Sequence, residues 1–265
     1  MRSKITLFVL VFAVLCAQAV PAGPLQKPPE NLQTVNHAFT PGEKLTYSIS
    51  WSDVVQAGTA VLEVSNGTTT DGRPTYRFTS RTKSSGMVDL VYPVQDVVES
   101  VVDAEDMSSL MFRLQESHGE KKRLRQMDFD RTHATVKVVV NNGTPEIYPV
   151  PERVQDALSS LYYVRTRQDF LVDKPIVIAV HDNEKTWSVE VYTVGREKIR
   201  TPAGEFDTVK IKTYPKYEGV FMHKGEIYIW LTDDARKIPV LMKSKISIGS
   251  IMATLTGIQG RQDKP

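Results

Sequence analysis

Cysteine is almost absent from this sequence, and Cys16 is its only example. It lies within residues 1–22, a segment that we expect to be removed, so the mature chain has no thiol. Disulfides, thiolate metal sites and cysteine nucleophiles are therefore excluded from it. A lipoprotein signal has a small residue before its cysteine, whereas Leu15 stands there, so lipid attachment is not expected.

Long apolar runs are also lacking. The longest, residues 5–17, follows Arg2 and Lys4 and precedes small residues suited to cleavage after Ala19 or Ala22. This is the layout of a secretory signal peptide. An uncleaved anchor is the alternative, but the run is short for a bilayer, and no later stretch reaches the roughly eighteen residues of a spanning helix.

An excess of charge of one sign is missing as well. Loss of residues 1–22, which hold two basic and no acidic residues, takes the formal net charge from +2 to 0. A neutral chain lacks the basic footprint of a nucleic-acid-binding protein. The densest basic stretch, 121–126, is surrounded by acids, which favours a solvated strand pair over a patch for anionic surfaces.

Motifs that carry chemistry are absent too. The five histidines are scattered, with no spacing that gathers metal ligands on one element. There is no nucleophile elbow, Ser-x-x-Lys set or phosphate-binding glycine loop. His118 in the stretch 117–120, and the stretch 181–184, are interpreted as turn residues between strands. We expect no metal and no cofactor, and the sequence favours a non-enzymatic protein.

What the sequence has in abundance is alternation of apolar and polar residues. In 45–51, four apolar residues alternate with three polar ones, the period of a strand with one buried face. Similar segments follow about every ten residues, between Asn-Gly, Asp-Gly and other turn signals. The predicted strands are 45–51, 59–64, 75–78, 96–102, 109–116, 122–131, 134–140, 176–181, 185–194, 206–214, 225–232 and 238–257.

These strands predict an all-β, mainly antiparallel fold, a curved sheet that forms either a barrel or a sandwich. We expect one such domain over 41–260, after a flexible linker over 23–40 that is rich in proline and polar residues. One helix is predicted near 152–166, where apolar residues recur at helical spacing and Pro151 and Glu152 suit a first turn. It has to lie against the sheet or close a barrel end.

The last predicted strand changes parity. Ile246 and Ile248 lie on one face, whereas Ile251, Ala253 and Leu255 lie on the other. Because side chains alternate strictly along a strand, we predict a β-bulge or sharp bend at Gly249-Ser250.

Aromatic residues on strands are the candidate ligand-binding residues. Ordinary core packing is the alternative, since a sequence does not reveal whether a barrel interior is filled. The residues predicted to line a cavity are Tyr47, Trp51, Tyr76, Phe78, Trp187, Tyr228 and Trp230.

The stretch from Trp230 to Pro239 holds two adjacent carboxylates, Asp233 and Asp234, followed by Arg236. Paired acids beside a cation can divide acid and base roles. The same residues suit a five-residue hairpin loop built on a type I turn. We favour the structural turn, made by Asp233, Asp234, Arg236 and Pro239, over catalysis.

Several segments together resemble a family of exported bacterial proteins catalogued as domain of unknown function number three-one-zero-eight. The likeness rests on "PGEKLTYSISW", "DALSSLYYVR", "TPAGEFDTVKI" and "GEIYIWLTDDARKIPVLMKSKISIGSIMATL", and spans about Thr40 to Gly257. It implies a Gram-negative periplasmic or envelope setting, one β-rich domain, and no catalytic residues to carry over. The recurring Trp-x-x-Asp-Asp element matches Trp230 to Pro239.

The sequence leaves three functions open. The first is a periplasmic, non-enzymatic protein that binds an apolar or amphipathic ligand, such as a lipid or an unfolded outer-membrane polypeptide. The second is an envelope interaction module with a filled core. The third is a hydrolase using Asp233 and Asp234, with His223 as a further candidate. In each case we expect no nucleic acid and, after signal cleavage, no membrane span.

Overall fold

A computed structural model describes residues 36–52, 54–182, 184–217, 220–221, 227–245 and 249–260. The predicted signal peptide and the first part of the predicted linker lie outside these residues. At the end of that linker, Ala38 and Phe39 are buried in the core, so the packed domain begins before the predicted boundary at 41.

The first half of the chain is a meander in which each strand pairs antiparallel with the next. Its elements are β1 (Lys44–Trp51), β2 (Val55–Thr68), β3 (Pro74–Ser84), α1 (Gly86–Val91), β4 (Val94–Asp103), β5 (Ser109–His118), β6 (Lys121–Asp130), β7 (Thr135–Val140) and β8 (Glu146–Pro149). In the β7–β8 turn, Asn141 and Asn142 both adopt positive φ, which asparagine tolerates.

The second half begins with a helix and continues as another antiparallel meander. Its elements are α2 (Ala157–Thr166), β9 (Ile176–Asp182), β10 (Lys185–Thr201), β11 (Gly204–Tyr217), β12 (Val220–Phe221), β13 (Ile227–Thr232), β14 (Pro239–Lys245) and β15 (Ser250–Gln259). The short β12 pairs with β11, to the side of the main path.

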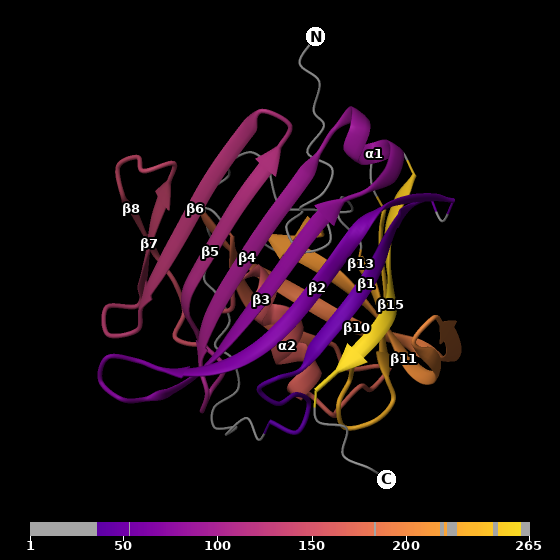
Figure 1. Cartoon of the computed structure of the whole chain (residues 1–265). Coiled ribbons are helices and arrows are strands. Elements are labelled where there is room, and N and C mark those ends of the chain that lie inside the picture. Colours follow the sequence, from indigo (N-terminus) through magenta and orange to yellow (C-terminus); the bar gives the residue numbers. More distant parts are fainter. Residues whose placement is uncertain are drawn as a thin grey trace.

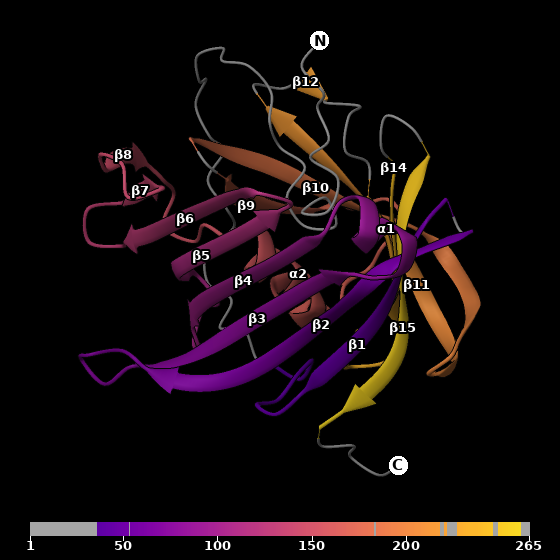
Figure 2. The same cartoon turned by 45° about the horizontal axis from the view of Figure 1, so that its top comes forward.

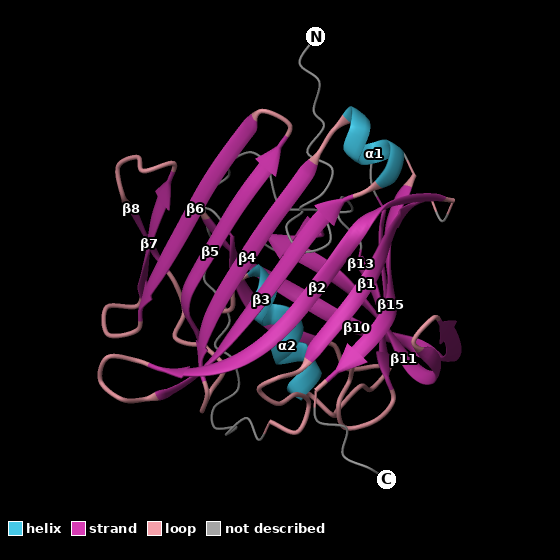
Figure 3. Ribbon diagram, viewed as in Figure 1, coloured by secondary structure: helices cyan, strands magenta, loops and turns pink. Residues whose placement is uncertain are grey.

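Pairing of β1 with β15 joins the two meanders into one sheet, in the order β8-β7-β6-β5-β4-β3-β2-β1-β15-β14-β13-β11-β10-β9. The sheet curls so that the second meander lies behind the first, with α2 between them (Figures 1 and 2). Apart from the two helices, the described chain is strand and loop (Figure 3). The predicted all-β antiparallel class is confirmed, as one barrel-like sheet.

Edge strand β9 is tied to the first meander by the segment before α2. Gln155 donates from its backbone N–H to the Ala179 carbonyl (2.8 Å), and the His181 N–H donates to the Gln155 carbonyl (2.8 Å). One residue earlier, the Val154 carbonyl accepts from the Ser109 N–H at the start of β5 (3.0 Å). This segment therefore bridges β5 and the edge strand β9.

Two apolar clusters fill the interior. The larger one surrounds α2, whose Leu158, Leu161 and Tyr162 are buried against β1–β4 and the second meander. The smaller one lies beneath β5–β7 and includes Phe112, Leu114, Met127, Val136 and Val138. Edge strand β9 touches both, because Ile178 and Val180 pack in the larger cluster and Ala179 against the smaller.

The predicted helix is shorter than expected. It begins at Ala157 rather than near 152, because Asp156 caps it and Gln155 is held extended by its bonds to β9. Pro151 and Glu152 therefore lie before the helix and not in its first turn. The short helix α1, which lacks any buried residue, has no counterpart among the predicted elements.

The predicted final strand was wrong. Residues 239–245 and 250–259 are two strands, β14 and β15, which pair antiparallel with Lys245 opposite Ser250. The parity changes because the chain reverses, not because a bulge shifts one strand. Gly249, with φ +84°, lies at the end of this reversal, and Ile246 and Ile248 are outside the described residues.

Candidate functional site

The inner face of the first meander carries a mostly polar row at directly opposed positions of five strands. Its members are one each from β2 to β6, and all except Asp96 are partly exposed although they point inward. We call this set, Ala60, Thr82, Asp96, Glu116 and Arg123, the inner polar row.

Asp96 forms a buried ion pair with His118, on the neighbouring strand. The His118 Nε2 lies 2.9 and 3.1 Å from the two Asp96 carboxylate oxygens, and both side chains are less than a tenth exposed. The hydrogen bond that His118 donates to the Asp96 carboxylate raises the pKa of His118, against the opposing effect of burial. His118 is thus the last residue of β5 and has a specific partner, Asp96. The interpretation of His118 as a turn residue missed this role.

Glu116 lies between Asp96 on β4 and Arg123 on β6. Burial raises its pKa, the nearby Asp96 carboxylate raises it further, and Arg123, whose guanidinium is 4.0 Å away, lowers it. Glu116 is therefore a carboxyl group that takes up a proton more readily than an exposed glutamate. Such a group can accept or donate a hydrogen bond as its surroundings change.

Arg125 is the third cation of this region. Its guanidinium is 2.6 Å from the Asp182 carboxylate, and both side chains are 6% exposed. This pair joins β6 to β9 and so ties the two meanders together across the interior. Asp96, Glu116, His118, Arg123, Arg125 and Asp182 make up what we call the charged cluster, with three acids and three bases.

The region around α2, in contrast, is filled. Arg165, completely buried, donates to both carboxylate oxygens of Glu43 (2.7 and 2.8 Å) and to the carbonyls of Ala38 (2.9 Å) and Arg236 (3.2 Å). The ring of Tyr162 lies 5.2 Å from the guanidinium and stacks on Phe78.

The start of α2 is anchored by a second buried carboxylate. Asp156 accepts from the backbone N–H groups of Leu158 and Ser159 and from the hydroxyls of Ser100 (2.6 Å) and Ser109 (2.7 Å). Burial raises the pKa of Asp156, and these hydrogen bonds act in the opposite direction. Asp156 is therefore a helix cap that is hydrogen-bonded to β4 and β5, and its carboxylate is completely buried among these donors.

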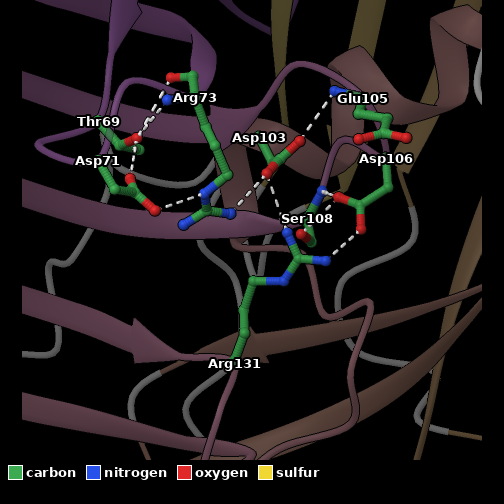
Figure 4. Close-up of polar contacts among 8 residues, drawn as sticks. All are labelled: Thr69, Asp71, Arg73, Asp103, Glu105, Asp106, Ser108 and Arg131. Atoms are coloured by element: carbon green, nitrogen blue, oxygen red, sulfur yellow. Dashed lines mark hydrogen bonds and ion pairs between the residues drawn. The ribbon is translucent and has the colours of Figure 1, made fainter.

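At the other end of β2–β6, three hairpin turns are tied together (Figure 4). The Asp103 carboxylate accepts from Arg73 and Arg131, both at 3.0 Å, and Arg131 also donates to Asp106 at 2.6 Å. Because these residues come from the β2–β3, β4–β5 and β6–β7 connections, the network fixes that end of the sheet.

The seven aromatic residues do not share one surface. Tyr47, Tyr76 and Phe78 point toward α2, and Tyr47 donates to the Pro239 carbonyl (2.8 Å). Trp187 is buried on the inner face of β10, whereas Trp51, at the end of β1, is 38% exposed. Of these five residues, four pack in the core and Trp51 lies at its edge.

Tyr228 and Trp230 lie on the opposite, outer face of β13. Their neighbours across the strands are Lys212 and Lys210, and the Lys210 ammonium lies 4.6 Å from the Trp230 ring. Trp230 also donates to Glu197 (2.7 Å). Neither residue can contribute to the same lining as Tyr47; that any of the seven binds a ligand stays a prediction.

The family described as "Protein of unknown function (DUF3108)" matches residues 46–256, most of the chain. The chain belongs to the DUF3108 family. None of the curated proteins compared with it matches.

The DUF3108 domain resembles a solved structure from Brucella abortus, described as a beta-barrel-like protein of domain of unknown function DUF1849. The TM-score is 0.54 at 10% identity, covering 82% of this chain and 97% of the other, which shows the fold alone. Two further structures have a TM-score of 0.36. One is described as "a putative exported protein" with a YmcC-like fold from Bacteroides fragilis (10% identity; 83% and 97% coverage), the other as "a putative lipoprotein" from Parabacteroides distasonis (11%; 87% and 100%).

In this DUF3108 domain the two adjacent aspartates connect β13 to β14. Asp234 accepts from the N–H groups of Arg236 (3.0 Å) and Lys237 (3.2 Å), and from the Thr232 hydroxyl (2.6 Å). Partial burial opposes its ionisation, yet the hydrogen bonds from Thr232 and Arg236 leave its pKa lowered. Asp234 is therefore held as an ionised loop-closing acceptor.

Asp233 pairs outward with Arg196 (2.7 Å), and Pro239 begins β14. These contacts are those of a loop, and they give no support to an acid–base pair. His223, the third residue of the hydrolase hypothesis, is outside the described residues.

The charged cluster was missed, although part of its signal was present. Arg125 shares strand parity with buried Met127, and Asp96 shares it with Val94. Parity alone thus places these charges on the inner face. Across the described ranges, no group of three or more metal-ligating side chains is arranged to hold a metal ion, and no helix is long and apolar enough to cross a membrane.

Proposed function

We propose that this protein is a non-enzymatic binding protein of the bacterial periplasm that holds an amphipathic molecule against the inner face of β2–β6. The inner polar row supports this proposal best. Four of its five members are partly exposed, and in the next row buried Ser80 and Arg125 lie among the apolar Leu62, Val98 and Leu114.

The chemistry of the row suits a polar headgroup. Arg123 has a side chain that is 41% exposed, and Glu116 is next to it with a raised pKa. Together they offer donors and a carboxyl group that can hydrogen-bond in either protonation state. Partly exposed apolar side chains, Val98 on β4 and Val189 on β10, are available to the apolar part of the ligand. The ligand class is a lipid or an unfolded outer-membrane polypeptide segment.

Native mass spectrometry with organic extraction tests the proposal on protein purified from its own periplasm. We expect a co-purifying species at fixed stoichiometry, whose mass distinguishes a lipid from a peptide. The variant Glu116→Gln/Arg123→Met should lose it. The outer-face pair Arg77 and Glu99 provides the matched control, Arg77→Met/Glu99→Gln, which should keep it. A bare mature mass in the unchanged protein refutes the proposal.

A further inference from the structure

An exposed apolar patch surrounds α1 and the β1–β2 turn. Met87, Leu90 and Val91 of α1 are 73%, 82% and 82% exposed, and Val54 in the turn is 85% exposed. Val55 is also exposed. We call these five residues the apolar rim. Large apolar side chains that gather at one exposed place usually mark a contact with a protein or a membrane.

The two parts of the rim lie side by side. The N–H of Ser85, the residue that precedes α1, donates to the Ala57 carbonyl of β2 (3.0 Å), two residues beyond Val55. Both views place α1 beside the β1–β2 end of the sheet (Figures 1 and 2). Trp51 ends β1 next to this turn and is 38% exposed.

Cations flank the rim. Exposed Lys83 lies two residues before Ser85, and β6 begins with exposed Lys121 and Lys122. The β5–β6 turn, which precedes these lysines, adjoins the end of α1, because the Gly119 N–H donates to the Pro93 carbonyl (2.8 Å).

Acids also lie near the rim. Glu120 is exposed, and Asp89 accepts a hydrogen bond from the Ser84 hydroxyl (2.5 Å). Asp53 is close in sequence but outside the described residues. Among the described residues, three lysines and two acids therefore lie beside the rim.

A protruding apolar helix with flanking lysines fits an anionic lipid surface. A bilayer accepts projecting apolar side chains without a matching groove, and its anionic headgroups attract nearby lysines. We propose that the apolar rim docks the protein on an anionic bilayer, with α1, Val54 and Val55 entering the headgroup region. This places the membrane beside Ser84 and His118, one row from the inner polar row.

The inference rests on the proposed function only in taking the ligand that the protein would collect from or deliver to the membrane to be a lipid. Docking itself is tested separately. Flotation of the exported, processed chain with vesicles of phosphatidylglycerol and phosphatidylethanolamine should recover it with the vesicles, and vesicles of phosphatidylcholine alone should recover much less. Met87→Ser/Leu90→Ser should weaken binding by about tenfold or more, since two large apolar side chains leave the interface. Lys121→Gln/Lys122→Gln should weaken it by about fivefold per lysine at low salt.

The matched control is Ile147→Ser/Val177→Ser, which removes two exposed apolar side chains from the edge strands β8 and β9. It should bind as the unchanged protein does. Quenching of tryptophan fluorescence by brominated lipid should be strong, and Trp51→Phe should abolish most of it, because Trp187 and Trp230 are buried.

Three results would overturn the docking proposal: an unchanged protein that does not float, equal binding by both double serine variants, or a dimer that Met87→Ser/Leu90→Ser converts to monomer in sedimentation velocity. The last would show that a second copy covers the rim. A chain that docks but carries neither lipid nor peptide contradicts the proposed function alone, and one that carries such a ligand without docking contradicts this inference alone.

Discussion

Replacing Arg165 by methionine should destabilise the domain more than any exposed charge change. The guanidinium is completely buried and has four acceptors, the two Glu43 oxygens and the carbonyls of Ala38 and Arg236. Methionine restores much of the volume but leaves Glu43, whose side chain is 11% exposed, without its cation. Breaking a buried pair from one side costs about 3–5 kcal/mol.

Urea unfolding followed by far-ultraviolet circular dichroism measures this loss. With an m-value of about 3 kcal/mol/M, a loss of about 4 kcal/mol lowers the midpoint by about 1.3 M. Arg167→Met is the matched control, because Arg167 follows the same helix and pairs with a more exposed Asp169. It should cost less than about 1 kcal/mol.

The double variant Arg165→Met/Glu43→Leu separates the pair from its surroundings. Replacing both charges by apolar groups removes the desolvation cost, so the midpoint should recover a large part of the single-variant loss. If Arg165→Met lowers the midpoint no more than Arg167→Met does, the buried pair is not what holds α2 to the segment before β1, and the reasoning is wrong.

Three further predictions concern pH, the helix cap and one glycine. Because Asp96 raises the pKa of His118, their ion pair stabilises the fold fully at pH values below the unfolded-state pKa of about 6.5, and this stability is lost as pH rises through the folded-state pKa. The urea midpoint should therefore fall over that pH interval. A His118→Gln variant that shows the same fall would contradict the assignment to His118. Asp156→Ala removes the acceptor of two helix N–H groups and should cost about 1–2 kcal/mol of stability, whereas the control Ser160→Ala should cost little. Equal urea midpoints for the two variants would be evidence against the cap. Gly58→Ala puts a Cβ 2.3 Å from the Lys83 carbonyl oxygen and should cost about 1–3 kcal/mol of stability, whereas a Cβ at the control position Gly195 meets nothing within 4 Å. Thermal melts in which Gly195→Ala is the more destabilised variant would count against the close approach of β2 to β3 at Gly58.

Most strands could be predicted because their signal is local. Period-two alternation and Asn-Gly or Asp-Gly turns give β1–β7 without knowledge of the partner strands. The pairing of β1 with β15 is not local, since Lys44 lies opposite Gln259, and no pattern within either strand encodes it. For the same reason the parity change near Gly249 is compatible with either a bulge or a reversal, and the bulge was the wrong choice.

The site was harder to predict than the fold. His118 precedes Gly119, so its local sequence indicates a turn, and only the opposed strand reveals Asp96 as its partner. Arg125 and Asp182 lie 57 residues apart and meet because the sheet curls. The aromatic residues failed to form one lining because strand parity puts Tyr228 and Trp230 on the outer face, a fact that required the register of β13 with its neighbours.

The union of the two meanders through β1 and β15 has a consequence for how the chain matures. Every other neighbour in the main strand order is close in sequence, so each half can acquire its pairings early, while β1 keeps one bare edge until Ser250–Gln259 becomes available. Because synthesis runs from the N-terminus, β15 is the last of the described strands to become available. An unpaired edge is a template for association with other chains. Loss of Ser250–Gln259 by truncation should therefore increase aggregation, because β1 then keeps an unpaired edge.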